Sequence, residues 1–202
     1  MTVGELDVSR ETTERLQHLV DLVRKWSPKI NLVSPSQLHC LWQRHVWDCA
    51  QLVSHAPPDP RRWVDLGSGG GFPGLVVSAL ALDRGWSTTV FLVESDQRKA
   101  AFLRRAATEM GVMPRVLATR SEQVVPLSAD VLSARAFAPL DRLLTHAVRH
   151  VAPDGVTLLP KGSGHEAEIA AARRHWRFTC DRRSSITDPD AAILKLTEIN
   201  RA

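Results

Sequence analysis

The glycine-rich stretch Val64–Gly74, which reads VDLGSGGGFPG, is the part of the sequence best suited to holding a ligand. Its glycines allow a tight chain reversal with positive φ, and they let a ligand touch the backbone where no Cβ intervenes. An apolar segment that is typical of a helix follows, with Pro73 suited to the first helical position. A strand, a glycine turn and a helix start present free N–H groups and a partial positive charge, which favour a carboxylate or a phosphate.

The glycine spacing alone leaves two ligand classes open. Gly69, Gly71 and Gly74 fit the G-x-G-x-x-G of dinucleotide enzymes, whereas Gly67, Gly69 and Gly71 fit the G-x-G-x-G of S-adenosylmethionine enzymes. The next apolar run, TTVFLVE, ends in Glu94, about 20 residues beyond the glycines. A carboxylate at that strand end can accept hydrogen bonds from both ribose hydroxyls of an adenosine. Both cofactors carry that ribose, so the choice depends on the rest of the chain.

Three further positions at predicted strand ends could contact a cofactor or an acceptor. Ser121 and Glu122 follow the third strand, where an adenine edge could be read, or where they could simply form a turn. Arg135, with Phe137 close by, ends the fourth strand, and Lys161 ends the fifth. A guanidinium can bind guanine O6 and N7 or form a structural salt bridge, and an aromatic ring can stack on a base. Such a site suits guanine N7, whose exposed lone pair needs alignment more than a general base.

Two amphipathic helices are predicted ahead of the glycine turn. The first covers Ser9–Trp26, with Ser9 as its N-cap and Pro28 ending it, and the second covers Leu41–His55. A proline-rich connection, APPDPRR, leads from them into the first strand. We therefore expect an N-terminal helical extension over residues 1–60 and an α/β core over residues 61–202 that forms one compact unit, the methyltransferase core if the ligand is S-adenosylmethionine.

Strands and helices then alternate, as in a mostly parallel α/β sheet with helices on both faces. We predict strands over 63–67, 88–94, 115–120, 129–135, 155–161, 178–186 and 191–198, and helices over 73–83, 97–110, 140–151 and 164–176. Only the short DPDA turn separates the last two strands, so they must pair antiparallel, because a parallel crossover needs about a dozen residues. This ending resembles the Rossmann-like class I S-adenosylmethionine methyltransferase fold. Pro160 is expected to end or bulge its strand just before Lys161.

Composition and charge restrict the classes of function. The 202 residues carry 44% hydrophobic and 24% charged side chains and a net charge of +4, and paired arginines permit a polyanionic partner. No apolar run could span a bilayer and no signal pattern opens the chain, so we expect a cytoplasmic protein. The three cysteines are scattered and the histidines lack ligand spacing, so neither a disulfide framework nor a metal site is indicated.

An ordered set of motifs resembles the RsmG family, also called GidB, the bacterial guanine-N7 methyltransferases of small-subunit ribosomal RNA. The set contains Asn31-Leu32, then Arg44-His45 with Asp48, then DLGSGGGFPG, SDQRKAAFL, SARAFAPL and LLPKG, and it covers nearly the whole chain. Arg44 and Asp48 lie one helical turn apart, so an exposed ion pair between them is the structural alternative to a substrate role.

The resemblance implies a cofactor, a substrate and a set of site residues. S-adenosylmethionine would be bound by Gly67, Gly69, Gly71, Phe72, Ser121, Glu122 and Arg135, with Glu94 near the ribose and Asp65 offsetting the sulfonium. The acceptor would be N7 of guanine 527 in 16S ribosomal RNA, in the small subunit or an assembly intermediate. Arg135 and Lys161, with Asn31, Arg44 and His45 on the substrate side, would orient the RNA. We expect a monomer without a metal.

Three other functions fit part of the sequence. A methyltransferase for a small acidic molecule would use the glycine turn but not the dispersed arginines. A non-catalytic ribosome-assembly factor could keep the fold and bind ribosomal RNA without binding S-adenosylmethionine. A nicotinamide oxidoreductase fits the glycines, but the closing antiparallel strands argue against it.

Overall fold

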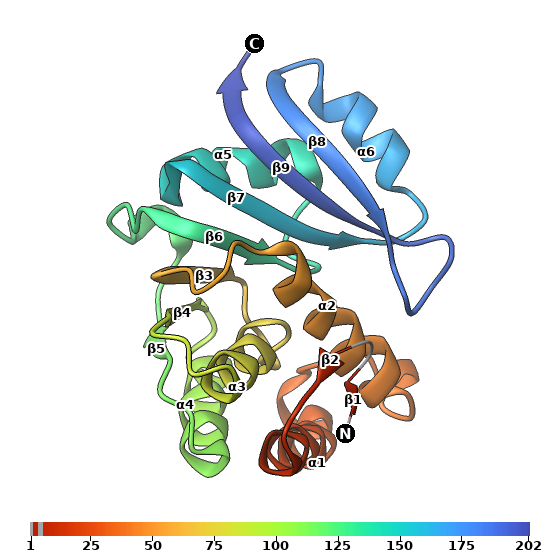
Figure 1. The fold of residues 1–202 in the computed structure, drawn as a ribbon, viewed down its shortest axis with the longest axis vertical. Helices are drawn as coiled ribbons and strands as arrows, with labels where there is room; N and C mark the ends of the chain where they lie inside the picture. The colour runs from red at the N-terminus through yellow and green to blue at the C-terminus, as the bar shows by residue number, and fades with distance from the viewer. Residues whose placement is uncertain (1, 4–5) are drawn as a thin grey trace.

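A seven-stranded sheet forms the centre of the molecule in this computed structural model, which describes residues 2–3 and 6–202. Its strands are β3 (Arg62–Leu66), β4 (Thr89–Val93), β5 (Arg115–Leu117), β6 (Ala129–Ala134), β7 (Val151–Lys161), β8 (Trp176–Ser184) and β9 (Ala192–Arg201). Their order across the sheet is β5-β4-β3-β6-β7-β9-β8 (Figure 1). The first five strands in the sequence run parallel, so their carboxyl ends meet at one edge of the sheet.

The last strands confirm the predicted antiparallel ending. β9 pairs antiparallel with β7 on one side and with β8 on the other, so it lies between two strands that precede it in the sequence. The loop between β8 and β9 projects beyond the sheet toward the N-terminal helices (Figure 1). This arrangement brings the last part of the chain next to the first.

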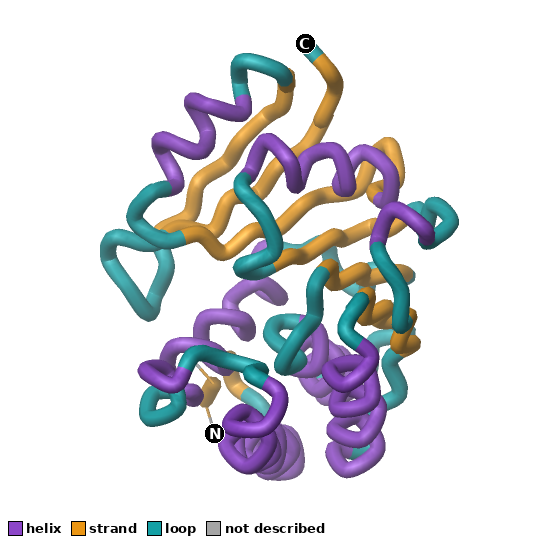
Figure 2. Tube along the Cα trace, turned by 180° about the vertical axis from the view of Figure 1, so that it is seen from behind, coloured by secondary structure: helices purple, strands orange, loops and turns teal. Residues whose placement is uncertain are grey.

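Helices cover both faces of the sheet (Figure 2). They are α1 (Arg10–Ile30), α2 (Asp48–His55), α3 (Gly74–Asp83), α4 (Gln97–Met110), α5 (Leu140–His150) and α6 (His165–Ala172). A short hairpin of β1 (Thr2–Val3) and β2 (Leu6–Asp7) precedes α1. In the described part of the chain, no helix is both long and apolar enough to cross a membrane.

Alternate residues of each strand contribute to two separate cores. Trp63 and Leu92 pack in one cluster with side chains of α1 to α4, whereas Val64, Leu66 and Val93 pack in the other with side chains of α5 and α6. This is the period of two that a strand buried on both faces requires. Because the first cluster includes both N-terminal helices and the sheet, the N-terminal segment and the core share apolar packing. The division at residue 60 stays a prediction.

Two predictions about the N-terminal helices need correction. Ser9 caps α1 as expected, because its hydroxyl accepts a hydrogen bond from Thr12 N–H. Pro28, however, does not end the helix, which continues to Ile30 and closes with Asn31 in the left-handed conformation. The missing N–H falls in the last turn, where Asn31 N–H still bonds to the Ser27 carbonyl at 2.8 Å, so the loss of one bond does not stop the helix.

The second predicted helix is not one regular helix. A π-helix over Trp42–Trp47 precedes α2, and it carries two of the predicted substrate-side residues, Arg44 and His45. Insertions of this kind widen a helix by one residue per turn and are frequent at functional sites. The apolar periodicity gave no signal for it.

The prediction that Pro160 disrupts its strand is wrong. β7 continues through Lys161, and Pro160 pairs in regular register with Ile193 of β9. The register shift in β7 lies instead opposite the start of β6. Pairing with β6 ends at Leu158, so Pro160 lies beyond that ladder, near the strand end, where a proline is tolerated.

Candidate functional site

The glycine turn follows β3 and leads into α3, as predicted. Gly67, Gly69 and Gly71 have φ values of 68°, 49° and 90°, which confirms that these positions need positive φ. Gly67 N–H donates to the Val93 carbonyl of β4 at 2.8 Å, which fixes the turn above the neighbouring strand end. Pro73 lies one position earlier than expected, because α3 begins at Gly74 and Pro73 is its N-cap.

Asp65 is not among the residues that line the cleft described below, so its role beside the sulfonium stays a prediction. It is fully buried, and its Oδ1 accepts from Ser133 Oγ at 2.9 Å while its Oδ2 accepts from Gly74 N–H at 3.1 Å. Ser133 Oγ in turn accepts from Trp63 Nε1–H at 2.9 Å. Burial raises the pKa of the Asp65 carboxyl to about 7. This carboxyl therefore ties β3 to β6 and to the start of α3.

A cleft of about 740 Å³ opens at the carboxyl edge of the sheet. Of the predicted site residues it brings together Asn31, His45, Gly67, Gly69, Phe72, Glu94 and Arg135. Gln37, Ser95 and Lys99 also line it; Ser95 and Lys99 belong to the motif SDQRKAAFL but were not singled out as site residues, and no motif contains Gln37. Ligands of open parallel sheets bind in such a crevice, where loops after several strands converge.

A second cavity of about 170 Å³ adjoins the cleft, because Ser95 and Phe137 line both. It contains the predicted Ser121 and Glu122, so these two residues lie beside the cleft and not within it. Ser121 is held from α5, since its Oγ lies 2.9 Å from His146 Nδ1. The two cavities together offer an elongated space.

Glu94 is tied to the glycine turn. Its Oε2 accepts from Gly69 N–H at 2.9 Å and its Oε1 accepts from Asp96 N–H at 2.8 Å. The side chain is 8% exposed and borders the cleft. Two backbone donors therefore hold the carboxylate at the end of β4, where the sequence predicted a ribose acceptor.

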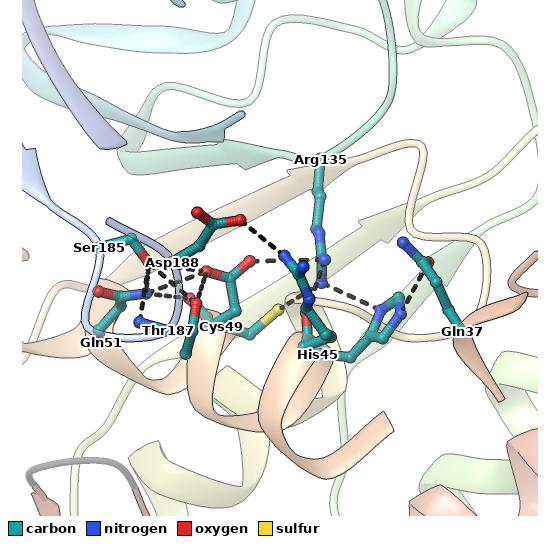
Figure 3. Close-up of polar contacts among 10 residues, drawn as sticks. Gln37, His45, Cys49, Gln51, Arg135, Ser185, Thr187 and Asp188 are labelled. Carbon is teal, nitrogen blue, oxygen red and sulfur yellow. Dashed lines mark hydrogen bonds and ion pairs between the residues drawn. The ribbon is translucent and has the colours of Figure 1, made fainter. Parts of the chain in front are cut away.

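Arg135 follows β6 and reaches from the sheet to the N-terminal helices (Figure 3). Its Nη1–H donates to His45 Nδ1 at 3.0 Å and its Nη2–H donates to the Arg44 carbonyl at 2.7 Å. Asp48 Oδ2 lies 3.5 Å from Nη2. The next residue, Ala136, has a φ of 51°, which few residues with a side chain adopt, so the chain leaves the strand sharply here.

His45 is neutral in this arrangement. Burial, together with the charges of Arg135 and Arg44, lowers its pKa to about 3. Its Nδ1 accepts the hydrogen bond from Arg135, so Nε2 carries the ring proton. Nε2–H donates to Gln37 Oε1 at 3.0 Å. Both ring nitrogens are thus engaged, and the imidazole positions the guanidinium.

Arg44 and Asp48 do not pair with each other, which was the structural alternative, and both instead contact the β8–β9 loop, whose Thr187 and Asp188 are labelled in Figure 3. Arg44 Nη1 pairs with Asp188 Oδ2 at 2.7 Å. Asp48 is buried, and its Oδ1 accepts from Thr187 Oγ1 at 3.0 Å and from Gln51 Nε2 at 3.1 Å. The loop partners lie about 140 residues further along the chain, so no local pattern could indicate them.

Lys161 lies outside the cleft, in a third cavity of about 120 Å³ that also contains Arg44 and Arg135. Its Nζ pairs with Glu168 Oε2 at 2.7 Å. Gly71 borders neither the cleft nor this cavity. It lies against Leu75, since a Cβ at that position would meet the Leu75 side chain. Arg135 and Gln37 each line both the cleft and the third cavity.

Comparison with known proteins assigns this geometry to a family. A family model described as rRNA small subunit methyltransferase G, or GidB, matches residues 12–195. The chain belongs to the GidB family. A Cereibacter sphaeroides protein named ribosomal RNA small subunit methyltransferase G is 52% identical over 194 residues, which cover 96% of this chain and 94% of the relative. The resemblance seen in the motifs is therefore confirmed.

Solved structures with low sequence identity show the same fold. Cofactor-bound Rv0187 from MTB has a TM-score of 0.59 at 19% identity, covering 98% of this chain and 94% of its own. A TehB-like SAM-dependent methyltransferase from Corynebacterium glutamicum has a TM-score of 0.57 at 16% identity, covering 74% of this chain and 86% of its own. This GidB protein has the Rossmann-like methyltransferase fold, and its cofactor is S-adenosylmethionine.

Proposed function

We propose that this GidB protein transfers a methyl group from S-adenosylmethionine to N7 of a guanine in 16S ribosomal RNA, at guanine 527 of the small subunit. Membership in the family supports S-adenosylmethionine-dependent methylation of small-subunit ribosomal RNA. The atom and the nucleotide are our proposal: the atom is argued from the chemistry of the cleft, and the nucleotide from the resemblance of the motifs.

The observation that carries the proposal is the state of the titratable groups beside the glycine turn. Among the described residues that line the cleft, His45 is neutral and has both ring nitrogens in hydrogen bonds. Glu94 has each carboxylate oxygen bonded to a backbone N–H. His45 is thus bound to its neighbours and Glu94 to the glycine turn, so neither group is placed as a general base for an acceptor. Guanine N7 needs no proton removed, because its lone pair is already exposed.

The cofactor's parts match the groups that the two cavities present. Backbone carbonyl groups of Gly67 and Gly69 would accept from the ammonium of the methionyl end, because both N–H groups are already bonded within the site. Glu94 would accept from the ribose hydroxyls, and Ser121 with Glu122 would contact the adenine edge. When bound, S-adenosylmethionine supplies a methyl group on a sulfonium, and the sulfur keeps the electron pair of the broken bond as the new N–C bond forms. The proposed roles of Gly71 and Phe72 are supporting ones, in the turn and at the wall of the cleft.

Arg135 and Phe137 would orient the acceptor. The guanidinium is 19% exposed, borders the cleft, and carries donors that suit purine oxygen and nitrogen atoms. Phe137 lies against Gly67, since a Cβ there would come within 2.5 Å of the ring, and it lines the cleft, where it could stack on a base. Asn31 and His45 border the same cleft, and Arg44 and Lys161 border the adjoining cavity, so all four would lie on the RNA side.

Nucleoside analysis tests the proposal. The purified protein is incubated with unmodified 16S ribosomal RNA and methyl-labelled S-adenosylmethionine, and the RNA is digested and separated by chromatography with mass detection. We expect the label in 7-methylguanosine from one site. Label in another nucleoside would refute the N7 assignment, and absence of label with tight cofactor binding would favour a non-catalytic RNA-binding role.

A further inference from the structure

Three cations converge on the small cavity beside the cleft, which we name the Arg44 pocket after Arg44, Arg135, Lys161, Asp48 and Asp188, five of the residues that line it. Each cation faces one carboxylate. Arg44 pairs with Asp188 at 2.7 Å, Lys161 pairs with Glu168 at 2.7 Å, and Arg135 lies 3.5 Å from Asp48. The pocket thus has an anion-binding wall whose charges are balanced from within the chain.

Two of the three carboxylates also accept hydrogen bonds that tie distant segments of the chain together. Asp48 is buried and accepts from Gln51, Ser185 and Thr187. Glu168 Oε2 also accepts from the Leu140 N–H at the start of α5, at 2.9 Å. Removing either carboxylate would break contacts that hold the helices and the loop together. Both are therefore part of the framework.

Asp188 differs from these two. It lies on the β8–β9 loop, and the cation opposite, Arg44, is 52% exposed, whereas Lys161 opposite Glu168 is 13% exposed. Its other side-chain contact is local, since Oδ1 accepts from the Asp190 N–H two residues on, at 3.0 Å. An exposed ion pair contributes little to stability, because water and salt screen it. The Asp188 carboxylate can therefore leave Arg44 at small cost, while the rest of the pocket stays in place.

We propose that the Arg44 pocket binds a backbone phosphate of the RNA substrate, and that the Asp188 carboxylate occupies the phosphate position in the free protein. A backbone phosphate offers the planar guanidinium two oxygens in the geometry that a carboxylate offers, with the same single negative charge, and the neighbouring phosphates of a polynucleotide add to the attraction. The position fits a nucleotide whose base enters the cleft, because Arg135 and Gln37 line both cavities. This inference rests on the proposed function, since it takes ribosomal RNA as the ligand.

The matched pair Asp188→Asn and Asp190→Asn tests the inference. Both remove one negative charge from the same loop, but only Asp188 contacts Arg44. Asparagine at 188 keeps the Oδ1 that accepts from Asp190 N–H, so the loop conformation is retained. Affinity for deproteinised 16S ribosomal RNA is measured by filter binding over a range of salt concentrations, and S-adenosylmethionine affinity is measured by calorimetry to show that each variant is folded.

We expect Asp188→Asn to bind the RNA about two- to fivefold more tightly than Asp190→Asn at low salt, the fold-change that one exposed ion pair represents. In an Arg44→Ala background this difference disappears. The association constant K falls as salt rises. Arg44→Ala makes the negative slope of log K against log salt shallower by about 0.7, the value for one phosphate contact on a single strand. The Arg44 carbonyl that holds Arg135 is unchanged by this substitution.

Equal affinities for the two asparagine variants would overturn the inference, and so would weaker binding by Asp188→Asn. Inorganic phosphate provides a second arm. If millimolar phosphate abolishes the advantage of Asp188→Asn without affecting Asp190→Asn at matched ionic strength, the pocket is a phosphate site as proposed. If phosphate binds Asp188→Asn but RNA affinity is unaltered, the site serves a free anion and the RNA assignment is overturned. The two possible failures are distinguishable. If the wild-type chain does not bind the RNA, the proposed function fails; if it binds the RNA but the two variants have equal affinities, only the phosphate pocket is refuted.

Discussion

Two buried groups at the site have pKa values shifted in opposite directions, so they contribute opposite pH dependences to stability. Burial and the nearby arginines lower the pKa of His45 from 6.5 to about 3, and burial raises the pKa of Asp65 from 3.8 to about 7. Each shift spans about three pH units, so each full contribution is on the order of 4 kcal/mol.

The signs follow from which state binds the proton. Between about pH 4.5 and 6, unfolded His45 is protonated and folded His45 is not, so the free energy of unfolding rises with pH. In the same window, folded Asp65 keeps a proton that the unfolded chain has released, so the free energy of unfolding falls with pH. Each slope is about 1.4 kcal/mol per pH unit, and the two slopes therefore cancel in the wild-type protein.

Single substitutions separate the two contributions. His45→Gln makes the slope of unfolding free energy against pH more negative than the wild-type slope by about 1.4 kcal/mol per unit, and Asp65→Asn makes it more positive by about the same amount. Lost hydrogen bonds move each curve as a whole and leave its slope unchanged, so the slope reports only the titration. Urea unfolding followed by tryptophan fluorescence, at several pH values from 4.5 to 6, measures it. Variant slopes equal to the wild-type slope would refute the assignment of a neutral His45 and a protonated Asp65.

The cleft itself gives two further predictions. Gly67→Ala weakens S-adenosylmethionine binding by at least about tenfold, because the new Cβ would lie 2.5 Å from Phe137 at a φ of 68°, whereas Gly85→Ala, at a φ of 64° with nothing within 4 Å, has the same backbone penalty and retains affinity. Calorimetry compares the two variants, and equal affinities would contradict the predicted place of the cofactor. Glu94→Gln raises the dissociation constant about tenfold, the worth of a hydrogen bond to a charged group, and it also weakens the tie to Gly69 N–H. An unchanged constant in the same assay would mean that the ribose lies elsewhere.

The sequence indicated features that depend on short stretches of chain. Gly67, Gly69 and Gly71 announced the turn because few other residues adopt positive φ. The antiparallel pairing of β8 and β9 followed from loop length, since a short loop cannot make a parallel crossover. Parallel strand ends meet at one edge, so placing Glu94 and Arg135 at strand ends was enough to bring them to one cleft.

Features set by contacts between distant segments could not be predicted. Asp65 lies near the carboxyl end of its strand, where a side chain can face a ligand. Its carboxyl instead accepts hydrogen bonds from Gly74 N–H and Ser133 Oγ inside the protein. The partner of Arg44 lies on a loop 144 residues away, and the nearby Asp48 was the only candidate within reach along a helix. Pro28 was expected to end α1, but the helix continues to Ile30. The rule that proline ends a helix considers the isolated helix and leaves out the tertiary packing that stabilises the last turn.

The central claim is that the guanidinium of Arg135, beside the glycine turn, orients the purine. The rate of methyl transfer by the Arg135→Ala variant tests it most directly. The measurement is the initial rate of methyl transfer from labelled S-adenosylmethionine to 16S ribosomal RNA, with Arg182→Ala on the exposed face of β8 as a control that removes the same charge. We predict a loss of about 100-fold for Arg135→Ala, the value of two charged hydrogen bonds at about tenfold each, to guanine O6 and N7, and little change for the control. Equal rates for Arg135→Ala and the wild-type protein would contradict the account.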